Sequence, residues 1–334
     1  MELSKKSKNA LRQDMFDEAV KAHEMWVESR LSDTEAGKRL HLPQGSEMAG
    51  IKMTGRSMHG AELRGVDLSG CNLNKANLGS ANLDLSDLRG VRANKTVFTS
   101  ASLRRTDLSN SKLQKATFVY ARAQESDFYK ADLKGAFMKK GNFLEANFNR
   151  AVLYGAEMSQ ADFTQAVMCN ADLRGAVMQG AQLKKADLDC SDLSGADLRE
   201  ARMCQASLVC TKAVGANLRG ATLDSTDLQG TDFTDADLTD CDLRGARLHQ
   251  TKGVLAYHTP EYSMFCSAKN FQINSQHDKP SIWLNCVGAN IAGTMIEQYD
   301  LFQNVIDAMV RQYFGIDSKL SRVELLIELR KRGL

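Results

Sequence analysis

From residue 51 onward, large apolar residues recur at every fifth position of the chain. The series keeps its register from Met53 to Leu248, forty positions occupied by 23 Leu, 7 Phe, 7 Met and 3 Ala. Five residues are neither one helical turn nor two, and in a flat strand every second member of the series would change faces. The period therefore excludes an ordinary amphipathic helix or strand and predicts a coil built from short sides.

The position two residues before each of these centres is restricted as well. From Ala61 to Ala246 it holds only Ala, Ser, Thr, Cys, Gly or Val, while the other three positions are mostly polar or Gly. Each five-residue unit thus offers one large and one small inward side chain, separated by an outward residue and followed by an outward pair that can turn the chain. On this pattern alone, a closed coil of three to five such units is possible.

The units resemble those of the pentapeptide-repeat family, whose motif is A(D/N)LXX. The motif is matched by ADLKG, ADLRG and ADLRE at residues 131–135, 171–175 and 196–200, and the resemblance covers residues 51–250. It implies a mainly β fold, a right-handed quadrilateral parallel β-helix with four units per coil. Forty units would then give about ten coils and, at ~4.8 Å per coil, a rod roughly 48 Å long.

The two ends of the chain differ from the repeats, because all three prolines and both tryptophans lie outside them. We therefore expect three parts. Residues 1–50 would form an N-terminal helix and lead-in cap, residues 51–253 the β-helix, and residues 254–334 a small C-terminal α+β or helical region that caps, docks or dimerises.

Residues 9–31 predict an amphipathic helix with one apolar stripe, formed by Leu11, Met15, Ala19, Ala22 and Trp26. Its His-x-x-Trp pair, followed by Gly-Lys-Arg, resembles the helical lead-in that often precedes the repeats in bacterial members of the family. A solenoid exposes strand edges and an unfilled core layer at its ends. Capping is therefore the role expected of this helix, ahead of partner binding.

The C-terminal region resembles no family. Apolar runs at Phe271–Ile273 and Ser281–Val287 predict short strands, and capping boxes that begin at Thr294 and Ser321 predict two helices. The region is larger than a cap requires. A docking role, or homodimerisation, is therefore as well supported as capping.

No motif in the sequence points to catalysis. No histidine lies between His59 and His249, so the column lacks the commonest general base. Phosphate-binding, nucleophile-elbow and zinc-protease motifs do not occur. The eight cysteines show no metal-ligand spacing. We expect a non-enzyme that needs no cofactor or metal.

Two sets of residues stack at twenty-residue steps. A row of carboxylates formed by Asp67, Asp87, Asp107 and Asp127 could align cations or have raised pKa values, although motif residues on a solvated face are the simpler interpretation. Cys190 and Cys210 would lie on adjacent coils, within the Cα range of a disulfide. Reduced thiols in a cytoplasmic protein are the simpler interpretation there.

The near-neutral composition, 43 Lys plus Arg against 41 Asp plus Glu, hides a polarised rod. Residues 89–140 carry 12 basic and 4 acidic residues, whereas residues 186–243 carry 4 basic and 12 acidic. The balanced total gives no reason to expect direct nucleic-acid or membrane binding. The candidate partner contacts are the basic residues Arg92, Lys95, Lys112 and Lys115 and the acidic residues Asp232, Asp235, Asp237 and Asp240.

Apolar and aromatic residues at outward positions supply the remaining candidates. Exposed apolar residues gathered in one place indicate an interface, whereas scattered ones are normal. The candidate contacts are Phe137, Tyr154, Tyr120 and Val177, accompanied by Val97, Val119 and Val152.

These features favour a protein-binding scaffold whose partner is an unidentified protein. Some members of the resembled family mimic B-DNA and bind DNA gyrase, protecting it from quinolones or toxins, so gyrase binding is an alternative. Mimicry needs an acidic rod, and these repeats carry 26 basic and 24 acidic residues. A secreted effector or a virion component is a third possibility. The chain has no apolar signal core or membrane-length span, so we expect a cytoplasmic protein, with non-Sec secretion left open.

Overall fold

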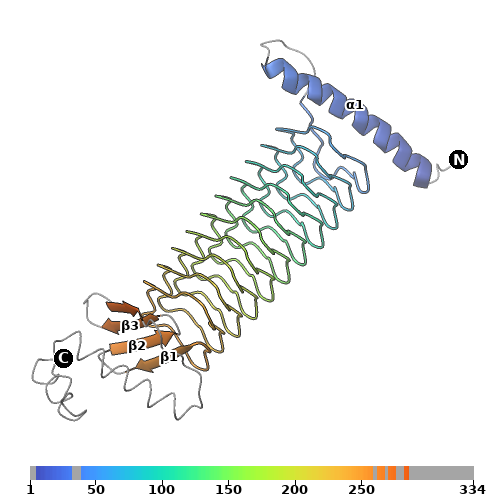
Figure 1. The fold of residues 1–334 in the computed structure, drawn as a ribbon. Helices are drawn as coiled ribbons and strands as arrows, with labels where there is room; N and C mark the ends of the chain where they lie inside the picture. Colours follow the sequence, from blue (N-terminus) through green and yellow to red (C-terminus); the bar gives the residue numbers. More distant parts are fainter. Residues whose placement is uncertain (1–4, 32–38, 259–261, 268–269, 276–281, 286–334) are drawn as a thin grey trace, which may run out of the picture. The chain divides into compact units, whose positions relative to one another are not determined.

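The structure is a computed structural model that describes residues 5–31, 39–258, 262–267, 270–275 and 282–285. It contains one N-terminal helix, α1 (Lys5–Leu31), and four short strands near the C-terminus. Between them, residues 39–253 form a stack of coils (Figure 1). The stack therefore contains the whole five-residue repeat.

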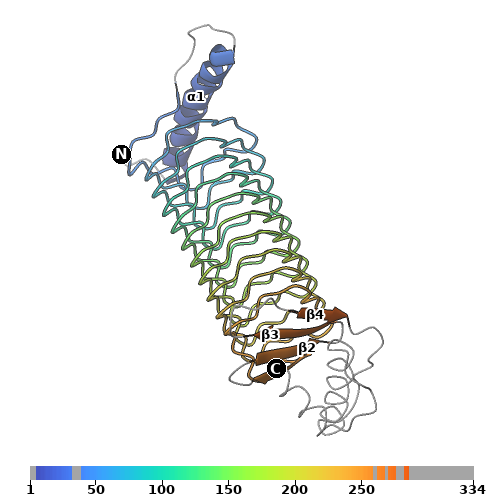
Figure 2. The same cartoon turned by 90° about the vertical axis from the view of Figure 1, so that its left-hand side faces the viewer.

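Parallel β-bridges join neighbouring coils at twenty-residue steps. Asp67 pairs with Asp87, for example, and the same step recurs from the bridge Glu47–Asp67 to the bridge Asp232–Lys252. Each coil therefore holds four five-residue units, and the view in Figure 2 shows the same succession of coils from another side. Of the coils of three to five sides that the pattern allows, the chain adopts the four-sided one.

A tight turn follows each apolar centre. In one unit the N–H of Ala61 donates to the carbonyl of Met58 at 3.0 Å, and Gly60 between them has a φ of 71°. A positive φ at the third turn residue is typical of a type II turn. Non-glycine residues also adopt it, for example Lys95 with a φ of 58°. These turns explain why the apolar period is five.

The interior of the column is filled as the sequence predicts. All forty centres from Met53 to Leu248 are buried, as are the small residues two positions before them from Ala61 to Ala246. Phenylalanines on successive coils stack in parallel pairs with centroids 4.7 to 5.1 Å apart, namely Phe98–Phe118, Phe128–Phe148 and Phe143–Phe163. Each pair spans one coil step, so aromatic packing reinforces the backbone ladder.

The helix α1 confirms the prediction for residues 9–31, but its predicted buried face is wrong. Phe16, Val20 and His23 are buried; of the expected stripe, Ala19 packs partly buried against the core, whereas Met15 is 64% exposed. The reason is that the neighbouring helix positions bind the polar open edge of the first coil. The Gln13 side chain, for example, bonds both the N–H and the carbonyl of Lys52, at 2.8 and 2.9 Å.

The four strands near the C-terminus form an antiparallel sheet in the order β1–β2–β3–β4. They are β1 (Val254–His258), β2 (Tyr262–Ser267), β3 (Asn270–Ser275) and β4 (Ile282–Asn285). The strand expected at Phe271–Ile273 is confirmed within β3, and the run that begins at Ser281 contains β4. The helices predicted to begin at Thr294 and Ser321 lie outside the described residues.

Candidate interaction surfaces

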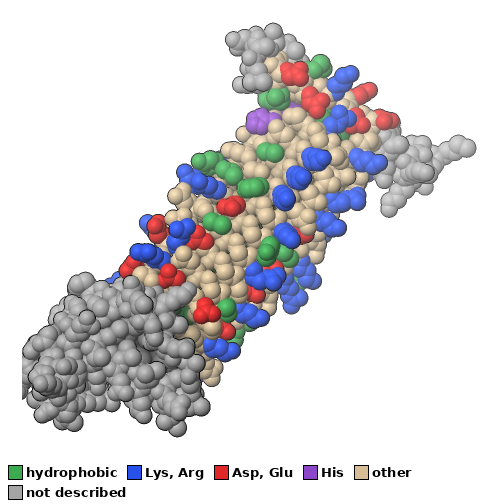
Figure 3. Space-filling view, viewed as in Figure 1, with side chains coloured by type: hydrophobic (Ala, Val, Ile, Leu, Met, Phe, Trp, Pro, Cys, Tyr) green, Lys and Arg blue, Asp and Glu red, His purple; other side chains and the backbone are tan. Residues whose placement is uncertain are grey.

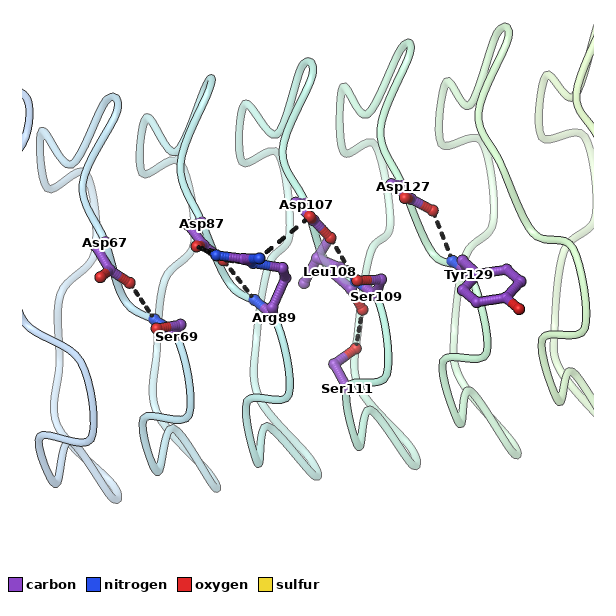
Figure 4. Close-up of polar contacts among 10 residues, drawn as sticks. All are labelled: Asp67, Ser69, Asp87, Arg89, Asp107, Leu108, Ser109, Ser111, Asp127 and Tyr129. Carbon is purple, nitrogen blue, oxygen red and sulfur yellow. Dashed lines mark hydrogen bonds and ion pairs between the residues drawn. The ribbon is translucent and has the colours of Figure 1, made fainter.

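The aspartate or asparagine that precedes an apolar centre commonly closes the next turn. In Figure 4 Asp67 accepts the N–H of Ser69 at 2.9 Å and Asp127 accepts that of Tyr129 at 2.8 Å. An Asx side chain bonded to the N–H two residues later mimics a backbone turn. The carboxylate of the repeated Ala-Asp-Leu triplet is therefore a structural group before it is a surface charge.

Arginine neutralises part of the carboxylate row predicted from the sequence. The guanidinium of Arg89 donates to Asp87, with Nη2 at 2.5 Å from Oδ2, and its Nε lies 3.8 Å from Asp107 (Figure 4). This hydrogen bond lowers the pKa of Asp87. The possibility that the row raises the pKa of its carboxylates is therefore wrong at Asp87. The described part of the chain also contains no group of three or more His, Cys, Asp or Glu arranged to hold a metal ion.

One carboxylate that the sequence analysis did not single out links two coils. Asp84 is 3% exposed and accepts four hydrogen bonds, from the Ser102 hydroxyl and from the backbone N–H, Nε and Nη2 of Arg104. Burial raises its pKa, but these hydrogen bonds and the nearby guanidinium outweigh that effect and lower it overall. The signal in the sequence is an aspartate one residue after an apolar centre, twenty residues before an arginine.

The predicted basic candidates lie together on one side of the column. Arg92 and Lys112 are bridge partners on adjacent coils, and Lys95 and Lys115 occupy the corners that follow them. All four are exposed, and none forms an ion pair with another described residue. Figure 3 shows rows of Lys and Arg side chains along the column. Their charges are therefore available for contact with another molecule.

Several of the predicted acidic candidates already accept hydrogen bonds or form an ion pair within the chain. Asp232 accepts the N–H and the hydroxyl of Thr234 at 3.0 and 2.6 Å, and these bonds lower its pKa. Asp237 binds Thr239 in the same way, and Asp240 lies 3.6 Å from Arg219. Asp235 occupies an exposed corner with a φ of 58°. The threonine bonds hold Asp232 in its ionised form, whereas Arg219 offsets part of the charge of Asp240.

The aromatic candidates are exposed, and cations contact two of them. Tyr154, 45% exposed, has Lys134 Nζ at 5.2 Å and Arg174 Cζ at 5.6 Å from its ring centroid. Tyr120, 54% exposed, has Lys140 Nζ at 5.7 Å. These are cation–π distances. The tyrosines therefore lie within basic surroundings.

Phe137 is 46% exposed and is bridged to Thr117 and Glu157 on the adjacent coils. Val177 lies two coils further along the same side. Its side chain is partly buried, so it offers less contact area than a fully exposed valine. Val152 is exposed as predicted. The sequence analysis missed two exposed apolar residues elsewhere on the column, Leu85 and Val167.

His23 fixes α1 to the first coils through both ring nitrogens. Nδ1 accepts the N–H of Leu40 at 2.9 Å, and Nε2 lies 3.0 Å from the carbonyl of His59. This pairing requires a neutral imidazole protonated at Nε2, and burial lowers the pKa of His23 accordingly. Its ring stacks on Trp26 at 5.4 Å. The His-x-x-Trp pair of the sequence therefore has a structural role.

The family model for pentapeptide repeats matches eight overlapping segments between residues 57 and 252, more than half of the chain. The chain belongs to the pentapeptide-repeat family. The fold of that family is the right-handed quadrilateral β-helix, and its members are generally structural or binding proteins rather than enzymes. No curated protein matches the chain in sequence.

Solved pentapeptide-repeat proteins are similar to this chain. HetL from Nostoc sp. strain PCC 7120, involved in heterocyst differentiation regulation, is 29% identical over 66% of this chain and 94% of its own, with a TM-score of 0.39. A thylakoid-lumen member from Arabidopsis thaliana is 33% identical over 28% of this chain and 69% of its own, with a TM-score of 0.24. QnrB1, a plasmid-mediated fluoroquinolone resistance protein, is 19% identical over 64% and 89%, with a TM-score of 0.24.

Pentapeptide repeats explain the column but not its surface. Among the described residues, no helix is both long and apolar enough to span a bilayer. What distinguishes this member is therefore the set of outward side chains that the motif does not require, above all the basic and aromatic residues described above.

Proposed function

We propose that this pentapeptide-repeat protein is a non-enzymatic, protein-binding scaffold. Its column of about ten coils would present a basic and aromatic surface in the first half and a more neutralised acidic surface in the second. Residues 1–50 would cap one end, and residues 254–334 would cap, dock or dimerise. The scaffold would act in the cytoplasm.

The observation that carries this proposal is the exposed basic and aromatic surface. Arg92, Lys95, Lys112 and Lys115 are exposed and have no ion-pair partner within the described residues, and Tyr154 lies in the same basic environment. Tyrosine and arginine are enriched where proteins bind each other. An acidic or mixed protein surface would satisfy these groups.

The rigidity of the support favours the same function. Each unit makes backbone hydrogen bonds to the next coil, as in the bond from Met58 N–H to Asn77 O at 2.7 Å and that from Asn77 N–H to Arg56 O at 2.9 Å. The backbone of such a ladder is already ordered, so binding need not pay for ordering a loop and costs only the freedom of the contact side chains. Contact residues on adjacent coils are therefore preorganised.

Gyrase binding by DNA mimicry is less well supported. The mimic would have to be the acidic coils, and in them Asp197, Asp227 and Asp242 are each paired with an arginine at 2.7 to 3.4 Å. A phosphate-like array requires unpaired charge. We expect the purified chain to leave gyrase-catalysed DNA supercoiling unchanged, and inhibition at stoichiometric concentrations would favour the alternative.

Site-specific photocrosslinking in cells tests the scaffold function. A photoreactive residue in place of Phe137 should form a defined adduct with one protein, and Lys140→Glu in the same chain, at an exposed lysine beside Tyr120, should diminish it. The matched control places the same probe at Thr164, outside this surface. Equal adducts at both sites, or none at Phe137, would contradict the proposal.

A further inference from the structure

One side of the column carries charges that reverse in sign about its midpoint. This side, called side A, is the part from Lys52 to Asp232 of a ladder of bridged residues in twenty-residue steps; the ladder ends one step later at Lys252, which has no counterpart at the other end. Its midpoint lies between Asp132 and Val152. Residues equally distant from that midpoint are opposite in charge, in the pairs Lys112 with Asp172, Arg92 with Asp192, and Lys52 with Asp232. Asp172 also pairs with Arg174 of its own chain at 2.8 Å, so Lys112 would join an existing ion pair.

The two remaining pairs of side A contain no like charges. They are Asn72 with Lys212 and Asp132 with Val152. If the midpoint moves by half a coil in either direction, Lys52 or Arg92 lies opposite Lys212, and two positive charges face each other. The ladder is therefore matched to its own reversed copy in one register.

The corner positions that follow side A show a steric match with the same midpoint. Lysines occupy the corners at Lys75, Lys95 and Lys115, and glycines occupy the equivalent corners at Gly215, Gly195 and Gly175. A Cβ added at any of these three glycines would meet no atom within 4 Å. Each lysine would therefore face a corner with room for its side chain.

We propose that side A is the interface of an antiparallel homodimer, in which two columns pack face to face. The two-fold axis runs along the strand direction between the coils of Asp132 and Val152. In an isologous interface each contact occurs twice, so three complementary pairs supply six charge contacts. Lys134 of one copy then faces Tyr154 of the other. This inference rests on the proposed scaffold function and names a second copy as the partner of one side.

The expected size of the interface sets the strength of the dimer. Side A spans nine coil steps, or roughly 43 Å, and one side of a coil is about 13 Å wide, which gives both copies together roughly 1,100 Å² of projected area. Specific interfaces bury about 1,200–2,000 Å² in total. We therefore expect a dimer that forms at micromolar concentration and dissociates as salt screens its charge pairs.

The test is the molar mass of the full chain, measured by light scattering over a concentration series at low and high salt. The wild type should be a dimer at low salt and a monomer at high salt. Lys112→Asp alone and Asp172→Lys alone should each raise the dissociation constant at least tenfold, because each places like charges together twice. The double variant should restore dimerisation. Lys112 occupies the same position of its five-residue unit as Asp172 does, so the fold accepts a lysine there. An unchanged circular dichroism spectrum would verify that each variant folds.

A monomer under all conditions would overturn the inference. A dimer whose dissociation constant is unchanged by both substitutions would also overturn it and would indicate an interface elsewhere, such as residues 254–334. Neither result bears on the Phe137 crosslink, since Phe137 lies outside side A. Failure of the dimer and failure of the scaffold function are thus distinguishable.

Discussion

Two phenylalanines six residues apart test the assignment of inward and outward positions. Phe143 is fully buried, stacked on Phe163 at 5.1 Å and in edge contact with Phe118, Phe128 and Phe148 at 5.7 to 6.4 Å. Replacing a buried Phe by Ala costs about 3–5 kcal/mol, and the cost increases where neighbours cannot fill the cavity. The ladder fixes the backbone of both adjacent coils, so we expect Phe143→Ala to fall in the upper half of that range.

Phe137→Ala is the matched control, because it removes the same side chain from a position that is 46% exposed. We expect it to cost less than about 1 kcal/mol, as most surface substitutions do. The measurement is urea unfolding followed by circular dichroism. If Phe143→Ala does not fold, Phe143→Leu, which introduces the commonest centre residue, should still cost about 1–2 kcal/mol. Equal losses at residues 137 and 143 would refute the register.

Three further predictions concern the polar groups. Burial lowers the pKa of His23 below its ordinary 6.5, so the unfolded chain binds the proton more tightly. Stability should therefore decrease as pH falls below about 6.5, and His23→Gln should remove this component from the pH dependence of the melting temperature. Asp84→Ala, which leaves four donors without their acceptor, should cost about 2–4 kcal/mol in urea unfolding, and a loss below about 0.5 kcal/mol would show that the link is unimportant. Mild oxidation should link Cys190 to Cys210 and spare Cys71, whose pKa burial raises to about 11, as peptide mass spectrometry would show.

The sequence alone predicts the column in detail, because its fold depends on a strictly local rule. An inward residue at Leu188 implies an inward residue at Leu193, and the inward positions from Ala61 to Leu248 follow from that rule alone. The buried centres could therefore be predicted without any information about contacts between distant parts of the chain. The same rule explains why exposed candidates such as Phe137 and Tyr154 could be identified as departures from it.

The parts that sequence reasoning missed depend on geometry between elements. The buried face of α1 is set by how the helix meets the open edge of the first coil, where Gln13 binds Lys52, and helix periodicity contains no such information. Similarly, the charge count over residues 186–243 overstated the acidic coils, since it leaves out Arg244 and Arg247, which pair with Asp242 and Asp227. Pairing within and between turns decides which charges remain available.

Function and stability can be separated at the corner lysines. Lys95 and Lys115 adopt φ values of 58° and 56°, a left-handed conformation that costs an ordinary residue about 1–2 kcal/mol. Glycine avoids this cost but gives up about 0.5–1 kcal/mol through the greater freedom of the unfolded chain. Lys95→Gly and Lys115→Gly should therefore change the free energy of unfolding by less than about 1 kcal/mol in urea denaturation. If these lysines contact a partner, the same variants should weaken binding or dimerisation and reduce its salt dependence. Unchanged binding at wild-type stability would show that these lysines serve only as corner residues, whereas marked unfolding would mean that the lysine side chains support the turns.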